Sequence, residues 1–361
     1  MNNKNGDTTK LLLILIIISL IILGIMGSIY YFSQSKARIL YVRSAEKYKL
    51  GTIEDIRNGI QSFRYLVTRY PNSRYAPKAM LQIGKGYELI FEKSKDERKL
   101  DIAEEEYYKI KKHFGNTLEA QNALFQIAHI NYLKNDYEEA QEKLDYILAE
   151  YVDTPLKPQI YTKKGYIYYQ LGEYKKALRF FNRKEASHDD LALTGKGECF
   201  FKLGEYDKAL LIFEDFIQYR KLSNYRPQVI KSFLDNCYFY AKKLATEKDY
   251  KQSNKLFDKI ISLFPDHKLA ENALYWKAEN YYDQKQYKNA IYAYQDVTKN
   301  SFTHKDDAAL FKLGMCYFEQ DMFEESLKYF QNIIDYYPDS MYLGMSKDWK
   351  KQSIREIKYR Q

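Results

Sequence analysis

Eight times along this 361-residue chain, a small residue is followed four positions later by a large, mostly aromatic one. The small residues lie 32 to 44 positions apart and are Gly59, Ala103, Ala140, Ala177, Ala209, Ser253, Ala290 and Ser326. Their large partners are Phe63, Tyr107, Leu144, Phe181, Phe213, Phe257, Tyr294 and Phe330. A small residue lets one helix approach another closely, and a large side chain fills the hole between neighbours. Because one helical hairpin cannot bury its apolar stripe alone, the recurrence predicts a stack of about eight helix–turn–helix repeats.

Turn-forming residues fall between the predicted helices. Gly172 and Gly204 each stand in a Leu-Gly-Glu-Tyr segment, where a first helix must stop and the chain must reverse. Pro71, Pro265 and Pro338 each end a second helix, and the residues after them can cap the next helix. The whole chain contains only 15 Gly and 7 Pro, which favours helices over sheets. The sequence therefore predicts an all-α protein.

Two segments, residues 80–87 and 310–317, carry two large apolar residues at a spacing of three, then glycine, then tyrosine. With the small and large residues that follow, they resemble the tetratricopeptide repeat (TPR), W-x2-L-G-x2-Y, then A-x3-F, then P. The resemblance covers about residues 40–340 and implies a right-handed superhelical solenoid whose first helices line the concave face. A charged stretch at 92–99 and a break near 221–227 would account for the longer steps, and residues 341–361 are expected to form a capping helix.

The links between repeats carry a second resemblance. The pattern Tyr-Pro-Asn-Ser followed by spaced alanines, from Tyr70 to Ala79, is similar to the bacterial envelope branch of the superfamily. That branch includes the assembly lipoprotein BamD and the YbgF/CpoB-type periplasmic proteins. The chain departs from BamD in lacking a lipid-modified cysteine after its apolar segment. In general character, a membrane anchor followed by many repeats, it also resembles the collar subunits of spirochete periplasmic flagellar motors.

An uncharged segment at residues 11–32 follows a short N-terminal tail at 1–10. Its length is enough to cross the ~30 Å hydrocarbon core of a bilayer as a helix. Tyr30, Tyr31 and Phe32 stand where an interfacial aromatic belt is expected. A cleaved signal peptide is the alternative, but its apolar region is typically shorter and ends at an A-x-A-like site. The sequence favours a transmembrane anchor in contact with lipid, followed by a linker at residues 33–39.

The flanking charges and the family resemblance disagree about the side of the membrane on which the repeats lie. Lys36, Arg38 and Arg43 follow the apolar segment, and a literal positive-inside count places the repeats in the cytoplasm. The resemblance to envelope proteins implies instead an inner-membrane protein with periplasmic repeats. Both orientations remain open at this point.

Residues that commonly form catalytic, metal or phosphate-binding sites are scattered along the sequence. The three cysteines form no C-x-x-C pair, and the five histidines never occur at metal-ligand spacing. The segments at 84–86 and 195–197 read Gly-Lys-Gly, but they fall inside first helices, not in phosphate-binding loops. The net charge of +9 is spread over mixed-sign faces and comes with no nucleic-acid-binding motif. We therefore expect no enzyme, cofactor, metal, nucleic acid or small-molecule substrate.

The resemblance to TPR proteins implies a binding surface on the first helices. Aromatic side chains are large and fairly rigid, which suits contacts with other proteins. Such residues could equally reflect a chain with 37 Tyr and 20 Phe, which places aromatics everywhere. The expected concave-groove residues are Phe125, His129, Tyr132, Tyr166, Tyr169, Phe201, Tyr238, Tyr275, Tyr282, Phe311 and Phe318.

These observations together predict a membrane-anchored scaffold for protein–protein interactions in a bacterial envelope assembly. The flagellar motor collar is the most specific form of this hypothesis. Two alternatives stay open: an envelope-assembly factor that holds client peptides in its groove, and a regulator anchored at the cytoplasmic face.

Overall fold

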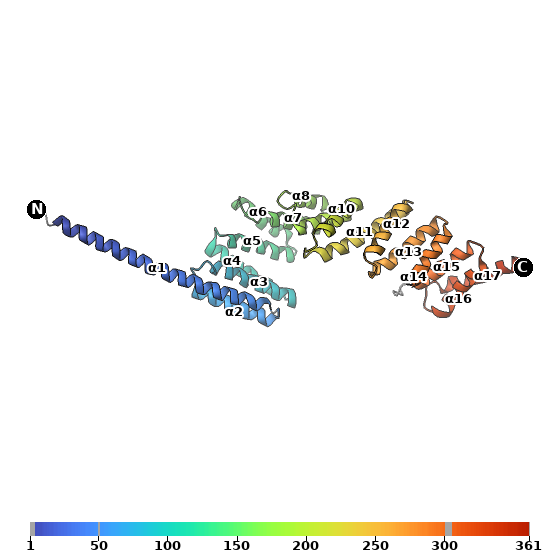
Figure 1. Ribbon diagram of the computed structural model, residues 1–361, viewed down its shortest axis with the longest axis horizontal. Helices are drawn as coiled ribbons and strands as arrows, with labels where there is room; N and C mark the ends of the chain where they lie inside the picture. The colour runs from blue at the N-terminus through green and yellow to red at the C-terminus, as the bar shows by residue number, and fades with distance from the viewer. Residues whose placement is uncertain (1–3, 50, 300–304, 361) are drawn as a thin grey trace. The chain divides into compact units, whose positions relative to one another are not determined.

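The computed structural model describes residues 4–49, 51–299 and 305–360, and every regular element in these ranges is an α-helix. In these described ranges seventeen helices follow one another (Figure 1). Residues 1–3 of the expected tail and residue 361 of the expected cap lie outside the described ranges. The prediction of an all-α protein is confirmed.

The helices belong to two compact units. Unit 1 (Met1–Leu171 and Arg183–Ser187) contains α1 (Lys4–Lys49), α2 (Ile53–Arg69), α3 (Ala76–Ser94), α4 (Arg98–Phe114), α5 (Leu118–Leu133), α6 (Tyr137–Glu150) and α7 (Lys157–Gln170). Unit 2 (Gly172–Asn182 and His188–Gln361) begins with α8 (Tyr174–Phe181), α9 (Asp190–Lys202), α10 (Tyr206–Tyr219), α11 (Arg226–Thr246) and α12 (Tyr250–Leu263). It continues with α13 (Lys268–Asp283), α14 (Tyr287–Lys299), α15 (Asp306–Phe318), α16 (Phe323–Tyr336) and α17 (Leu343–Arg360).

The even-numbered helices α2 to α16 are the second helices of the eight predicted repeats. Each carries one small residue and one large residue of the recurring pair, and all of these residues are buried. Phe63, Phe213 and Phe330, for example, have no exposed surface. The repeat prediction is therefore confirmed.

Glycines on the first helices make room for these large side chains. A Cβ atom added to Gly84, Gly197 or Gly314 would overlap the ring of Tyr107, Phe213 or Phe330, respectively. In each case the ring comes from the second helix of the same repeat. The two Gly-Lys-Gly segments lie inside α3 and α9 with their glycines buried, so their role is close helix packing.

The turn between the two helices of a repeat has a recurring left-handed residue. Gly172 and Gly204 adopt φ values of 75° and 73°. The corresponding positions in four other repeats also have positive φ, although the residues there are Asn135, Lys248, Lys285 and Asp321. Glycine is the residue that adopts this conformation without steric cost. The turn geometry is thus common to repeats that do not all share the favourable residue.

The first helix, α1, differs from the prediction. It runs without interruption from Lys4 to Lys49, so the expected linker at 33–39 is helical. The side chain of Ala37 has no exposed surface, and the Gln34 side-chain oxygen accepts a hydrogen bond from the Arg74 backbone N–H at 3.1 Å. Packing against the repeats therefore starts before residue 40, and residues 33–39 continue the helix from the apolar segment into the first repeat.

The N-terminal part of α1 projects away from the other helices of unit 1 (Figure 1). Within the described residues, Leu15–Tyr48 is long and apolar enough to cross a membrane by length and composition. Large apolar side chains such as Leu20 and Ile25 are more than half exposed there. The hydroxyls of Ser19 and Ser28 donate to backbone carbonyls of the same helix, which satisfies polar groups that hydrocarbon would leave unpaired.

Unit 2 is continuous through residues 221–227, where a break was expected. Phe216 of α10 and Phe233 of α11 belong to one buried cluster that spans this connection. The units instead divide at Leu171 and Gly172. At the C-terminal end α17 covers the last repeat, and its Trp349 ring lies 5.0 Å from the ring of Phe318.

Candidate partner-binding surface

The predicted groove residues occupy three positions relative to a small residue on each first helix. This reference residue stands twelve positions before the small residue of the second helix and is Ala128, Gly165, Gly197, Ala241, Ala278 or Gly314. The predicted residues lie three before it, one after it or four after it. Each of these positions has a different environment in the structure.

Aromatics three positions before the reference residue pack inward. The rings of Tyr238, Tyr275 and Phe311 lie 6.2, 5.7 and 5.7 Å from the large aromatic of their own second helix. Tyr275 and Phe311 are only 7% exposed. Phe125 packs against the core of unit 1. This position therefore contributes to the core: Tyr275 and Phe311 present little surface to a partner, whereas Phe125 and Tyr238 are half-buried.

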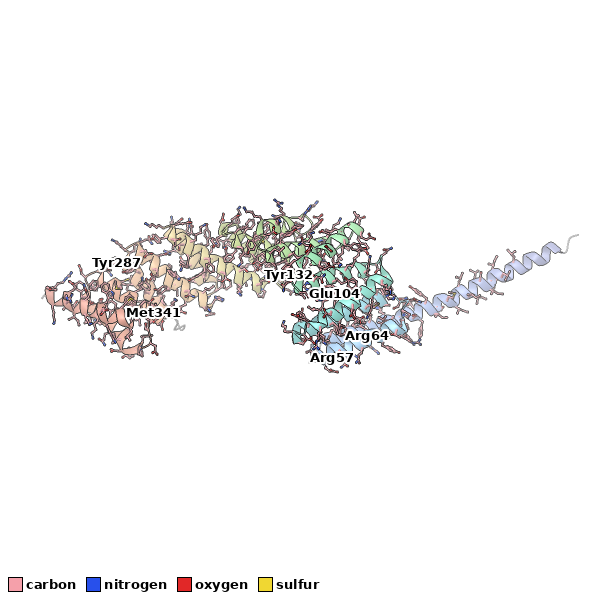
Figure 2. The ribbon with its side chains drawn as sticks, turned by 180° about the vertical axis from the view of Figure 1, so that it is seen from behind. Arg57, Arg64, Glu104, Tyr132, Tyr287 and Met341 are labelled. Carbon is pink, nitrogen blue, oxygen red and sulfur yellow. The ribbon has the colours of Figure 1, made fainter. Side chains whose placement is uncertain are left out.

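In unit 1, residues one and four after the reference meet a lysine of the next repeat. Lys163 of α7 lies with its Nζ 3.0 Å from His129 Nδ1 and 4.6 Å from the centre of the Tyr132 ring. The His129 and Tyr132 rings stack with their centres 6.3 Å apart. Both rings are on α5, where Tyr132 is labelled in Figure 2. The lysine stands two positions before its own reference residue, Gly165.

The same arrangement occurs in unit 2 between α13 and α15. Lys312, two positions before Gly314, lies 2.8 Å from Glu279 and 4.7 Å from the centre of the Tyr282 ring. Glu279 and Tyr282 stand one and four positions after Ala278. Sequence reasoning found His129, Tyr132 and Tyr282 but missed both lysines and Glu279. The signal that could have found them is the shared register of the two lysines.

Aromatic contacts replace the lysine between other repeats of unit 2. Phe239, at the lysine's register position on α11, lies 5.8 Å from Phe201 of α9 and is 49% exposed. Trp276 occupies that position on α13, and Lys242 Nζ lies 3.3 Å from its ring centre. Within each unit, the pairs of first helices α5–α7, α9–α11, α11–α13 and α13–α15 therefore contact each other through rings and ammonium groups. We call these residues the inter-repeat row.

Three predicted residues remain at the edges of this row. Tyr166 and Tyr169 lie on α7, with their rings 6.2 Å apart. Phe318, four positions after Gly314, lies 5.0 Å from both Phe323 and Trp349. Phe318 therefore packs on α17 in the way that the equivalent residue of another repeat packs on the next first helix.

Burial shifts the pKa values of Lys163 and of the ionisable groups near it. Burial lowers the pKa of Lys163 to about 8 and the pKa of His129 to about 4. Burial also raises the pKa of Glu88 on α3 to about 7, although the Tyr107 hydroxyl donates a hydrogen bond to its carboxylate. At neutral pH the histidine is therefore uncharged, while the lysine keeps its charge.

The shifts of Glu88 and His129 predict compensating effects of pH on stability. The folded protein holds a proton on Glu88 that the unfolded chain releases, so this contribution is lost as pH rises from about 4.5 to 7. His129 resists protonation in the fold, so its contribution is lost as pH falls from about 6.5 to 4. We expect Glu88→Gln to remove the carboxyl contribution and leave the opposing histidine contribution, up to about 1.4 kcal/mol per pH unit.

Denaturant unfolding at pH 4.5, 5.5 and 6.5 measures these two contributions in the single variants Glu88→Gln and His129→Asn. Glu88→Gln should lose stability as pH falls, whereas His129→Asn should gain it, each relative to the native chain. Parallel pH profiles for all three proteins would contradict the shifts.

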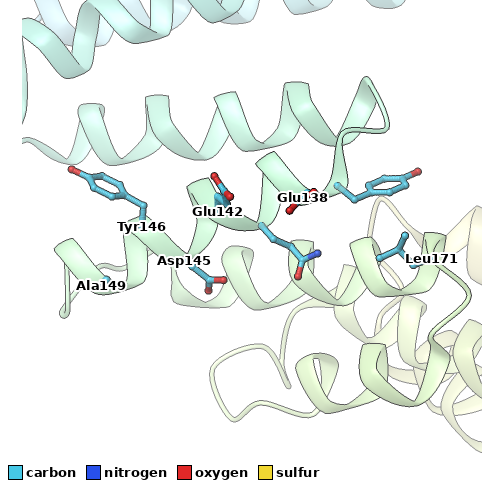
Figure 3. A pocket seen from close by; sticks show the side chains of 8 residues that line it. Glu138, Glu142, Asp145, Tyr146, Ala149 and Leu171 are labelled. Atoms are coloured by element: carbon cyan, nitrogen blue, oxygen red, sulfur yellow. The ribbon is translucent and has the colours of Figure 1, made fainter.

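A second surface lies on the side of the second helices in unit 1. A hollow of about 800 Å³ is lined by Tyr137, Glu138, Gln141, Glu142, Asp145, Tyr146, Ala149 and Leu171. Its carboxylates project from α6, with Tyr146 and Leu171 toward opposite ends (Figure 3). Asp145 is paired with Lys164 at 2.5 Å. Sequence reasoning did not single out this acidic, tyrosine-edged hollow.

The cysteine side chains lie in the core. Cys199, Cys237 and Cys316 are buried, and burial raises the pKa of each thiol to about 12. Among the described residues, no three His, Cys, Asp or Glu side chains gather in a way that could hold a metal ion.

Comparison with known families identifies the repeats. A tetratricopeptide repeat model matches residues 272–301 and 308–340, and a tetratricopeptide repeat-like domain model matches residues 84–237. No curated protein shows a significant sequence match to the chain.

Several solved structures overlap the chain at low identity. A tetratricopeptide repeat protein from Parabacteroides merdae is 18% identical, with a TM-score of 0.37, over 74% of this chain and 98% of its own. The apo form of RapI is 14% identical, with a TM-score of 0.47, over 91% of this chain and 98% of its own. The TPR domain of P58(IPK) is 16% identical, with a TM-score of 0.32, over 90% of this chain and 99% of its own. None of the three carries an argument about what this chain binds.

Proposed function

Because this chain belongs to the tetratricopeptide repeat superfamily, we propose that it is a membrane-anchored scaffold that binds other proteins through its first-helix face. The observation that carries the proposal is the inter-repeat row. Its rings and ammonium groups lie at the boundaries between repeats, and Phe239 is half exposed. Aromatic side chains are enriched in protein interfaces, and Tyr and Trp are common among the residues that contribute most to binding. The half-buried members, Tyr132, Phe201 and Tyr282, are better candidates than the buried Tyr275 and Phe311.

The test substitutes one exposed ring of the row. Phe239→Ala is expected to weaken binding of protein partners about 30-fold, which is typical of an interface aromatic at the centre of a contact. Tyr292→Ala is the matched control, because Tyr292 is 69% exposed but lies on the second helix α14. The measurement is quantitative mass spectrometry of proteins crosslinked to each variant in native membranes. Loss of partners from Tyr292→Ala alone would place binding on the second-helix side.

The location we propose is a bacterial inner membrane, with the span at residues 11–32 in contact with lipid and the repeats in the periplasm. The Tyr70–Ala79 link and the apolar first part of α1 support this assignment. Within the envelope, the flagellar motor collar is the assembly we propose. Cryo-imaging of motors in a deletion strain tests it: an unchanged collar and normal motility would reject the collar and leave the scaffold proposal standing.

A cytoplasmic orientation is favoured by one specific observation. Lys36, Arg38 and Arg43 lie on α1 directly after the apolar segment, and cytoplasmic flanks are usually enriched in such residues. Protease treatment of spheroplasts separates the orientations, since periplasmic repeats would be digested and cytoplasmic repeats protected. Protection of the repeats would reject the periplasmic location and favour a regulator anchored at the cytoplasmic face of the membrane.

An envelope-assembly factor that holds client peptides would use the same face. Lys163 of α7, which contacts His129 of α5, favours this alternative, because it offers a charged group to a bound segment. The crosslinking experiment distinguishes the two functions: a collar subunit should retain a few fixed partners, whereas a client-binding factor should retain many partners in an extended state.

A further inference from the structure

Unit 2 has a cationic hollow at the edge where successive repeats connect. The hollow has a volume of about 520 Å³ and lies between the start of α11 and the connection from α12 to α13. Its ionisable lining residues are Lys221, Arg226, Lys231 and His267. Among the described residues, no aspartate or glutamate lines it. The remaining lining residues are Ser223, Pro227, Ile230, Leu234 and Phe264.

The three lysine and arginine side chains of the hollow have no acidic partner in the fold. Arg220, just before the hollow, is paired with Asp190 at 3.0 Å. In contrast, no ion pair within the described part of the chain includes Lys221, Arg226 or Lys231. The Arg226 Nε atom is buried and has no hydrogen-bond partner there. A buried donor without a partner is costly, so an anion that enters the hollow would satisfy it.

Large apolar side chains are exposed beside the hollow. Leu222 is 99% exposed and stands between two lining residues, Lys221 and Ser223. Tyr219 and Leu263, the last residues of α10 and α12, are more than half exposed. Apolar side chains that enter the headgroup region, together with lysines and arginines, hold a peripheral surface on an anionic membrane. The surroundings of the hollow have both components.

The exposed apolar position recurs along unit 2. Tyr219, Leu263 and Tyr336 each stand ten positions after the small residue of their second helix, and all three are exposed. The residues at this position in the first three repeats are polar or charged, namely Arg69, His113 and Glu150. Because each second helix ends here and the chain passes to the next repeat, equivalent positions lie on one edge of the stack. The apolar edge is therefore a property of unit 2 and not of every repeat.

We propose that this edge of unit 2 binds the surface of a membrane that contains anionic phospholipids. A headgroup phosphate enters the hollow and accepts hydrogen bonds from Arg226 and Lys221, and Leu222 lies at the boundary between headgroups and acyl chains. A guanidinium beside two ammonium groups suits a phosphate, which arginine binds in a bidentate manner. The chain also has a helix long and apolar enough to cross a bilayer, so a membrane is the surface it meets in the proposed anchored form.

The inference goes beyond the proposed function, because it uses neither the inter-repeat row nor the span at residues 11–32. The contact is electrostatic and peripheral. Unlike the span, it does not resist carbonate extraction, and it weakens as the salt concentration rises.

The binding experiment uses the full chain embedded in phosphatidylcholine nanodiscs, to which sucrose-loaded vesicles are added. The vesicles contain phosphatidylcholine alone or a mixture with phosphatidylglycerol, and bound protein is measured by co-sedimentation. We expect the mixed vesicles to bind at least about 25-fold more tightly, since each lysine or arginine near an anionic surface contributes about fivefold. Equal binding to the two kinds of vesicle would overturn the inference.

Substitution of the cations tests the hollow itself. Arg226→Gln should reduce the preference for mixed vesicles about fivefold. Lys221→Gln should do the same, and because Lys221 is exposed this second variant is not expected to disturb folding. Lys251→Gln is the matched control, since Lys251 is an exposed lysine at the opposite end of α12 from the hollow. Thermal unfolding of each variant shows that it is folded, and equal losses from all three would reject a site at the hollow.

Substitution of the leucine tests the apolar component. Leu222→Ser should weaken binding to mixed vesicles about fivefold, because a leucine that enters the interface is only partly removed from water. Leu211→Ser is the matched control, since Leu211 is also more than half exposed but lies within α10, away from the edge.

A fluorescent label locates the contact. Cys199, Cys237 and Cys316 are buried, so a thiol-reactive dye attaches selectively to Leu222→Cys or to the control Leu211→Cys. Quenchers carried by the lipids of the mixed vesicles should quench the dye at position 222 and not at position 211. Quenching at 211 alone would place the contact on another face and overturn the inference.

Two further outcomes identify a different occupant of the hollow. Release of the protein from vesicles by inorganic phosphate, with Leu222→Ser binding as the native chain does, would show a site for free phosphate and overturn the membrane contact. Loss of crosslinked proteins from Arg226→Gln in native membranes would assign the edge to a protein and overturn it as well. We expect Arg226→Gln to keep the partners that Phe239→Ala loses, so the scaffold function and the membrane contact can fail separately.

Discussion

Gly197→Ala is expected to lower the free energy of unfolding by about 1–3 kcal/mol, as overpacking of a full core does. A Cβ at this position would overlap the Phe213 ring, and that ring is fully buried between α9 and α10. In an exposed helix the same substitution would instead be stabilising by up to about 1 kcal/mol, because alanine has the higher helix propensity. The opposite sign is therefore specific to the close approach of the two helices.

Gly344→Ala is the matched control for this prediction. Gly344 lies in α17, is exposed and has no neighbouring atom within 4 Å of an added Cβ, so the substitution should be neutral or stabilising. Phe213→Leu should lose stability by itself, yet it should relieve part of the Gly197→Ala cost when the two are combined. Urea unfolding of the four proteins measures the coupling. A Gly197→Ala protein as stable as the native chain would contradict the proposed packing.

Two truncations of α1 are expected to have opposite effects. Deletion of residues 1–32 should convert the protein from one that resists carbonate extraction to a soluble one, with its unfolding free energy changed by less than about 0.5 kcal/mol. The described side chains of residues 15–32 are exposed and mostly apolar. Retention of this truncated chain in the membrane pellet would show a second membrane attachment.

Deletion of residues 1–49 should destabilise the first repeat by about 3–5 kcal/mol, since it removes large, partly buried side chains that pack on its core. The Tyr48 ring lies 5.6 Å from the Phe63 ring, and its hydroxyl donates to the Gln82 carbonyl at 2.9 Å. The Tyr41 ring lies 5.4 Å from Phe63 on the same side of α1. Unfolding midpoints of the two truncated chains make the comparison. The mass of the native protein from cells also distinguishes an anchor from a signal peptide, which would leave a shorter chain.

The repeats could be predicted from the sequence because their packing repeats locally. Ala209 and Phe213 are four positions apart on one helix, and each repeat places this pair against its own first helix, so the pattern survives changes of turn length. The helical state of residues 33–39 was missed for a different reason. Hydropathy shows where an apolar segment ends, but Lys36, Ala37 and Arg38 are good helix formers, and no turn residue stands among them.

The binding surface was predicted less well because residue type does not reveal direction. Tyr275 and Tyr282 are both tyrosines on α13, yet the first packs on Tyr294 in the core and the second lies under Lys312 of the next repeat. A register relative to Ala278 separates the two positions. Lys163 and Lys312 look like ordinary solvated lysines in the sequence, and their environment depends on contacts between successive repeats.

The unbroken α1 has a mechanical consequence. At 1.5 Å per residue its 46 residues form a rod of about 70 Å, whose first part is suited to the bilayer and whose last part is packed into the first repeat. Helices bend sharply chiefly at a proline, a glycine–serine pair or a bulge. Gly27–Ser28 is such a pair and lies in the apolar part of α1, whereas residues 33–39 contain none. In the membrane-anchored form proposed above, the helix after Ser28 therefore turns together with the first repeat, and a bend between the repeat and the membrane is expected inside the bilayer, at Gly27–Ser28.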